Sequence, residues 1–189
     1  YLYTILKILH STLKIKQENI LESIASLENI NKKISSLNLT KGNPSLDLAK
    51  WITGIPMIYY PFGLQSASIR FKNSLQENSK MHVISEDIIE ACHNGIVAWS
   101  KSSIVKPILI RGIDDSLKTK QRYEIIKKLL NESKIEFKEI FSIKGNILTK
   151  LICLIYLLDF SSIYKAVMLE LDPTPVVPIE YVKTQLMKR

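Results

Sequence analysis

The chain has 189 residues, of which 46% are hydrophobic and 23% charged, and this composition excludes disordered, collagen-like and disulfide-rich classes of protein. Its length permits one domain, or one domain with an added helical segment. The 26 Lys and Arg residues against 18 Asp and Glu residues give a net charge of +8, which favours anionic partners without choosing among nucleic acid, membrane and phosphorylated metabolites.

The first fifty or so residues follow a helical pattern. Between Asn19 and Leu37, apolar residues recur at every third or fourth position and form one face of a long amphipathic helix. The segment Lys41–Pro44 combines a helix stop with an N-cap Asn and a Pro at the first helical position, which predicts a second helix reaching about Ile52. We therefore assign residues 1–53 to a helical segment.

After Gly54, short apolar runs alternate with helical patterns. The runs predict strands at 55–60, 81–85, 107–110 and 135–141, and the patterns between and after them predict helices at 67–78, 119–132, 145–170 and 179–187. Strands separated by helices of this length indicate parallel crossovers, so residues 54–189 are predicted to form a doubly wound α/β domain with a mainly parallel sheet. Ligands of such folds bind beyond the carboxyl ends of the strands, which directs the search to the loops after Tyr60, Ser85, Ile110 and Phe141.

Several classes of partner are not expected. The most apolar run, Ile147–Leu158, is too short to cross a bilayer and contains Lys150, so we interpret it as a buried helix and expect no membrane partner. Cys92 and Cys153 have neither disulfide nor metal-site spacing, which favours the cytoplasm. The lysines are spread along helical patterns without a nucleic-acid-binding motif, so we expect no nucleic-acid partner, although salt-dependent binding through a basic face stays an alternative.

Motifs of common cofactor and metal chemistry are absent from the sequence. It contains no GxGxxG, GxxxxGK[ST], HExxH or GxSxG, and its three histidines lack neighbouring ligand residues. We therefore expect no cofactor and no metal.

Polar and ionisable residues are concentrated at 70–80 and 92–94. A carboxylate near a basic residue, such as Glu77 near Lys80, can act as a general base, and an imidazole such as that of His93 can move a proton near neutral pH. Each group also has a purely structural interpretation, as a solvated helix end for Glu77 and as a structural histidine for His93.

The pattern Arg-x-Lys-x-x-x-x-Glu-Asn-Ser-Lys at 70–80, followed by His-Asn at 93–94, resembles the bifunctional phosphoglucose/phosphomannose isomerase family. Segments 157–164, 171–173 and 179–183 are similar to the closing helices of that family, so the resemblance covers nearly the whole chain. It implies that 54–189 is the second of two sugar-isomerase (SIS) subdomains, with a three-layer fold. Residues 1–53 would connect it to a first subdomain that carries the phosphate loop, since Tyr1 falls where the second half of the family begins.

The resemblance also implies roles for individual residues. The family interconverts glucose 6-phosphate or mannose 6-phosphate and fructose 6-phosphate through a cis-enediol, without a cofactor. Glu77 would carry the proton between C1 and C2, His93 would open the sugar ring, and Lys183 would lie near the substrate hydroxyls or the developing enediolate. The residues implied to bind substrate are Arg70, Asn78, Lys80 and Asn94. His93 would serve the site of the neighbouring subunit, which implies a homodimer.

The chain departs from the family pattern at three places. Gly95 follows the His-Asn pair where an acidic residue is usual, Gln76 replaces an Asn, and Met81–His82 occupies the place of a Pro. These changes bear on rate and sugar preference rather than on the class of reaction. Without the phosphate loop, the chain alone is expected to be inactive. The alternative function is a non-catalytic SIS module that senses sugar phosphates.

Overall fold

The computed structural model describes residues 2–40, 42–101 and 103–188; Tyr1 and Lys41, on which two of the expectations rest, lie outside these ranges, as do residues 102 and 189. The helices are α1 (Leu2–Ile8), α2 (His10–Leu13), α3 (Gln17–Ile34), α4 (Pro44–Trp51), α5 (Gln65–Ser79), α6 (Ile88–Ala91), the 3-10 helix η1 (Gly95–Ser100), α7 (Leu117–Glu132), α8 (Ile147–Met168) and α9 (Val177–Met187). The strands are β1 (Ile55–Tyr60), β2 (Ile84–Asp87), β3 (Val105–Arg111) and β4 (Lys138–Phe141).

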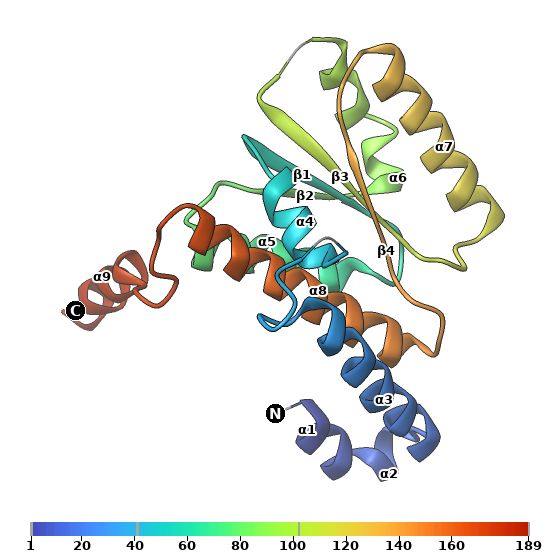
Figure 1. Ribbon diagram of the computed structural model, residues 1–189, viewed down its shortest axis with the longest axis vertical. Coiled ribbons are helices and arrows are strands. Elements are labelled where there is room, and N and C mark those ends of the chain that lie inside the picture. Colours follow the sequence, from blue (N-terminus) through green and yellow to red (C-terminus); the bar gives the residue numbers. More distant parts are fainter. Residues whose placement is uncertain (1, 41, 102, 189) are drawn as a thin grey trace.

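The four described strands form one parallel sheet in the order β2-β1-β3-β4. From β1 the chain first moves outward to β2 and then crosses back to β3 and β4. Helices α4, α5 and α8 therefore cover one face of the sheet, and α6, η1 and α7 cover the other (Figure 1). The predicted doubly wound α/β fold is confirmed.

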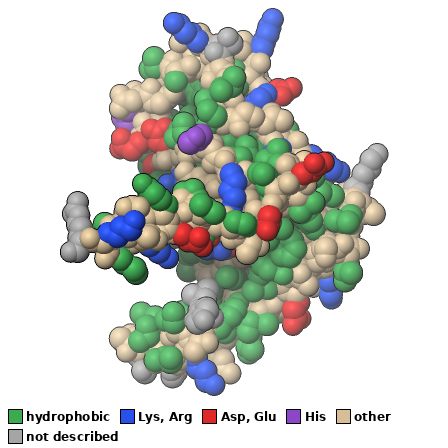
Figure 2. All heavy atoms as spheres, turned by 90° about the vertical axis from the view of Figure 1, so that its left-hand side faces the viewer, with side chains coloured by type: hydrophobic (Ala, Val, Ile, Leu, Met, Phe, Trp, Pro, Cys, Tyr) green, Lys and Arg blue, Asp and Glu red, His purple; other side chains and the backbone are tan. Residues whose placement is uncertain are grey.

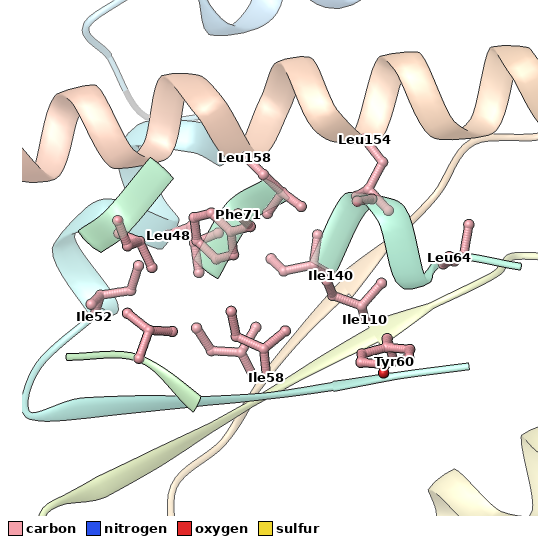
Figure 3. Close-up of a cluster of buried hydrophobic side chains, with 14 residues drawn as sticks. Leu48, Ile52, Ile58, Tyr60, Leu64, Phe71, Ile110, Ile140, Leu154 and Leu158 are labelled. Carbon is pink, nitrogen blue, oxygen red and sulfur yellow. The ribbon is translucent and has the colours of Figure 1, made fainter. Parts of the chain in front are cut away.

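The central strand β1 supplies both cores because its side chains alternate between the two faces. Ile58 and Tyr60 point toward α8, where Leu158 joins the same cluster (Figure 3). Met57 and Tyr59 belong to the second cluster, under α6 and α7. All but the first residue of β1 are buried, which explains why its sequence is continuously apolar.

Strands β2 and β4 each begin three residues later than the sequence predicts. Pairing with β1 starts at Met57 opposite Ile84, and pairing of β3 with β4 starts at Ile108 opposite Lys138. The preceding residue of the inner strand is a proline in both cases, Pro56 and Pro107. Because proline has no N–H to donate, pairing with the outer strand begins only at the residue after each proline.

Helix α8 is the long apolar helix that the sequence predicts. It has 22 residues, and an 18-residue window of it has a mean hydropathy of 1.7, so by length and composition it is the one helix in the described residues able to cross a membrane. The expectation that this apolar stretch is too short to cross a bilayer is therefore wrong, because the helix continues beyond residue 158 to Met168. Its buried side chains include Leu154 and Leu158, which pack on the sheet with Leu48 of α4 and Phe71 of α5. This packing makes α8 the central helix of one layer.

Asn43 joins the helical segment to the body of the molecule. Its side-chain oxygen accepts hydrogen bonds from the N–H groups of Ser45 and Leu46, and its amide donates to the carbonyls of Ile34 and Asn38. The predicted N-cap is therefore confirmed. Helix α4 packs in the core of the sheet layer, while the division of the chain at residue 53 stays a prediction.

Candidate active site

Glu77 lies at the amino edge of the sheet, the edge at which the strands begin. Helix α5 runs from the carboxyl end of β1 back to the amino end of β2, and Glu77 is in its last turn. The side chain is exposed. Ligands of doubly wound folds usually bind at the carboxyl ends of the strands, and the sequence directs the search to the loops there. Glu77 lies at the opposite edge of the sheet and is not part of those loops.

A hollow of about 430 Å³ lies between the end of α5 and the start of α9. Its lining residues are Asn73, Gln76 and Glu77 from α5, Lys80 directly after that helix, and Pro175, Val176, Pro178 and Ile179 from the other side. Figure 2 looks onto α9, where exposed hydrophobic side chains lie among charged ones. The fold therefore brings the predicted base close to the helix that carries Lys183.

Lys80 holds the two walls of this hollow together. Its Nζ donates to the carbonyl oxygens of Glu77 at 2.6 Å, Pro175 at 2.7 Å and Pro173 at 3.4 Å. An ammonium group has three N–H donors, so these contacts use all of them. The structure thus places Lys80 between α5 and the segment before α9, and its predicted contact with substrate stays a prediction.

Arg70 and Asn78 contact α8 and do not line the hollow. The Arg70 guanidinium donates to both carboxylate oxygens of Asp159 at 3.2–3.3 Å, and Asn78 Nδ2 donates to Ser162 Oγ at 2.8 Å, so both side chains contact α8. The hydrogen bond to Asp159 raises the pKa of Arg70. Arg70, Asn73 and Glu77 have the spacing i, i+3 and i+7 of one helical face, so the sequence gives no sign that Arg70 pairs with Asp159 instead of lining the hollow.

His93 and Asn94 lie far from Glu77 along the fold. They follow α6, which begins directly at the carboxyl end of β2 and packs in the cluster on the opposite face of the sheet. Both side chains are exposed, and the backbone N–H of His93 donates to the carbonyl of Glu90 at 2.9 Å. Within one chain the structure therefore brings Glu77 to the helix of Lys183 but does not bring His93 to either of them.

Gly95 has an acidic neighbour from another part of the chain. A Cβ added at Gly95 would lie 2.6 Å from Glu86 Oε2, so the Glu86 carboxylate rests against this backbone. The chain thus carries an acidic group next to the His-Asn pair, although it comes from β2. The sequence shows Glu86 among the polar residues between the two motifs but not its position beside Gly95, because only folding brings β2 and the start of η1 together.

The described residues offer no cluster for a metal ion. Within 2–40, 42–101 and 103–188, no group of three or more His, Cys, Asp or Glu side chains could hold one. Burial raises the pKa of the Cys92 thiol, and it raises that of Cys153 to about 11. Neither thiol therefore has the lowered pKa of a reactive nucleophile.

The comparisons with known proteins agree with the resemblance seen in the sequence. The family model "Bacterial phospho-glucose isomerase C-terminal SIS domain" matches residues 41–186. The chain is 30% identical over 146 residues to the bifunctional phosphoglucose/phosphomannose isomerase of Caldicellulosiruptor bescii, covering 75% of this chain and 43% of that protein. It is 28% identical over 165 residues to the protein of the same name from Aquifex aeolicus, covering 85% and 50%.

The structural comparison extends the likeness to the fold. A glucose-6-phosphate isomerase like protein from Thermus thermophilus superposes with a TM-score of 0.70 at 16% identity, covering 88% of this chain and 55% of that one. At this identity the likeness shows the fold alone. The chain spans about half the length of the curated relatives that it matches.

Proposed function

The chain belongs to the family of bacterial phospho-glucose isomerase C-terminal SIS domains, and on this premise we propose that it supplies half of the active site of a cytoplasmic hexose 6-phosphate isomerase. The enzyme interconverts glucose 6-phosphate or mannose 6-phosphate and fructose 6-phosphate through a cis-enediol. The observation that carries this proposal is the hollow in which Glu77 faces the start of α9. A preceding subdomain, which residues 1–53 connect to 54–189, contributes the phosphate loop.

Glu77 acts as the base. Proton transfer between C1 and C2 requires one carboxylate within hydrogen-bond reach of both carbons. The Glu77 carboxylate is exposed on the wall of the hollow, where a bound sugar can approach it. The transferred proton also has to be shielded from water. The hollow is open in this chain, so the preceding subdomain provides the cover when substrate binds.

Lys183 provides the positive charge. Ile179 lines the hollow, and Lys183 follows it by four residues on the same side of α9. An ammonium group on this side lies near the oxygens of the substrate, where it stabilises the negative charge of the enediolate. No cofactor is required, because the base and this cation handle the proton and the charge.

His93 completes the site of a second subunit. The sheet separates it from Glu77 within one chain, so ring opening at the Glu77 hollow takes a histidine from outside that chain. A homodimer supplies it reciprocally. Asn94, which is exposed beside His93, reaches the substrate in the same way.

The test measures turnover in the chain extended by its upstream coding region. Conversion of glucose 6-phosphate and mannose 6-phosphate to fructose 6-phosphate is expected in the parent protein, with a loss of about a thousandfold or more in kcat for Glu77→Gln. Glu90→Gln is the matched control, since Glu90 is an exposed carboxylate outside the hollow. A folded parent protein that binds both sugars but converts neither would instead support the sugar-phosphate sensor.

A further inference from the structure

We propose that Lys80 is a positioning residue that latches α9 to the end of α5 and thereby holds Lys183 over Glu77. The "Lys80 latch" is the set of bonds from Lys80 Nζ to the carbonyls of Glu77, Pro173 and Pro175. The roles of Glu77 and Lys183 rest on the proposed function. The latch itself rests only on these contacts, so it can be tested without any enzyme assay.

Helix α9 needs such a latch because packing alone does not hold it. None of its 11 residues is buried. Its apolar side chains remain exposed, from 47% for Ile179 to 85% for Met187. In Figure 1, α9 stands at one end of the molecule, away from the sheet. The position of the helix therefore depends on the segment that precedes it.

That preceding segment is stiff enough to transmit a fixed position. Pro173 and Pro175 have restricted φ angles, and the Asp172 carboxylate accepts a hydrogen bond from the N–H of Thr174 at 2.9 Å. This hydrogen bond lowers the pKa of Asp172, and the nearby charge of Lys80 lowers it further. Two of the three carbonyls that Lys80 binds belong to this segment, so fixing them fixes the first turn of α9.

The latch also fixes the last turn of α5. The carbonyl of Glu77 is one of those at a helix end without a partner inside the helix, and Lys80 Nζ satisfies it. One ammonium group thus joins the backbone of the predicted base to the linker of the predicted cation. Lys80 has no N–H left to donate to substrate, so in this proposal it affects catalysis by positioning Glu77 and Lys183.

A second lysine provides a matched control. Lys80 ends α5 with φ 54°, and Lys134 follows α7 with φ 55°, so both have the left-handed conformation that usually favours glycine. The Lys134 side chain is exposed and makes no hydrogen bond or ion pair within the described ranges. The two positions therefore share residue type and backbone conformation but differ in the latch.

The experiment compares hydrogen exchange of the α9 amides in this chain and in its Lys80→Met, Lys80→Arg and Lys134→Met variants. Loss of hydrogen bonds to a charged group is expected to raise α9 exchange about tenfold in Lys80→Met. Lys80→Arg keeps a charged donor and recovers part of the protection, while Lys134→Met leaves α9 unchanged. Equal α9 exchange in the parent chain and in Lys80→Met would overturn the proposal.

A kinetic measurement in the extended protein separates the latch from direct substrate binding. A positioning role predicts that Lys80→Met lowers kcat about tenfold with little change in KM, and that Lys80→Arg recovers part of kcat. A rise in KM at unchanged kcat would assign Lys80 to substrate binding and contradict the latch. Failure of the proposed function would show as inactivity of the parent protein, whatever the exchange of α9.

Discussion

Asp159 of α8 pairs with Arg70 of α5, with 3.2 Å between Arg70 Nε and Asp159 Oδ1. The same carboxylate oxygen accepts a hydrogen bond from the hydroxyl of Ser74 at 2.6 Å. Arg70 is more than half exposed, whereas Ser74 is buried. The buried hydroxyl therefore depends on Asp159 more than the exposed guanidinium does.

The two partners should differ in their effect on stability. Arg70→Met removes a solvent-screened pair and is expected to cost about 0.5 kcal/mol of unfolding free energy. Asp159→Ala also leaves the Ser74 hydroxyl buried without its acceptor, so we expect a cost of about 2 kcal/mol. Urea titration measures both values. If Asp159→Ala costs no more than Arg70→Met, Ser74 does not depend on this contact.

Two glycines with positive φ should respond differently to the same substitution. A Cβ at Gly54, which has φ 66°, would overlap the backbone carbonyl of Ile104, whereas one at Gly63, with φ 88°, would meet nothing within 4 Å. Gly54→Ala is therefore expected to cost about 3 kcal/mol or more, because β1 and β3 would have to separate. Gly63→Ala should cost about 1 kcal/mol from the backbone conformation alone. Thermal unfolding of the two variants provides the comparison, and equal costs would place the strain in φ rather than in the clash.

Alkaline stability should depend on two buried tyrosines. Burial raises the pKa of Tyr59 to about 12, and it raises that of Tyr123 as well. Above about pH 10 the unfolded state has lost tyrosine protons that the folded state retains, so the free energy of unfolding falls as pH rises, by about 1.4 kcal/mol per pH unit for each group.

Tyr59→Phe should make that alkaline fall less steep. The variant also loses stability at neutral pH, because Trp99 Nε1 donates to the Tyr59 hydroxyl at 2.9 Å in the buried core. Urea titrations at several pH values above about 9 measure the slope. Tyr181→Phe, which removes a tyrosine that is 64% exposed, is the control. A slope unchanged in Tyr59→Phe would contradict the shifted ionisation.

Mixed dimers test the reciprocal site. In the extended protein, Glu77→Gln and His93→Gln are each expected to be inactive, yet a dimer of one subunit of each kind contains one intact pair of groups. Random assembly from equal amounts should regain about a quarter of the parent activity, since half of the dimers carry one of two sites. Activity measured after mixing, unfolding together and refolding provides the answer. No recovery, with dimers present by light scattering, would place both groups in the same chain.

The alternation of strands and helices could be predicted from the sequence, because β1 and residues 107–110 of β3 are short continuous apolar runs between longer helical patterns. The residues at which β2 and β4 begin could not be predicted from the sequence. They depend on Pro56 and Pro107 in the neighbouring strands, and a segment read by itself does not show what lies opposite to it. Segments 81–83 and 135–137 therefore look like strand but have no partner in the sheet.

The candidate site could be predicted in its residues but not in its contacts. Glu77 and Lys80 belong to one motif, yet their different surroundings depend on where α9 packs. Arg70 and Asn78 belong to the same motif and contact α8 instead. The Glu86 carboxylate beside Gly95 depends on pairing between strands. In each case the sequence identifies the residue but does not show which helix or strand its side chain contacts.

Helix α5 divides its side-chain contacts between α8 and the hollow, and this has a consequence for how the protein can change. Arg70, Ser74 and Asn78 hydrogen-bond to side chains of α8, whereas Asn73 and Glu77 border the hollow. Asn73 and Gln76 take no part in the hydrogen bonds to α8, so a library of substitutions at residues 73 and 76 would vary the lining of the hollow while the helix keeps its attachment. The lining of the hollow can therefore change, in nature or in the laboratory, while the contacts that hold α5 to α8 are kept.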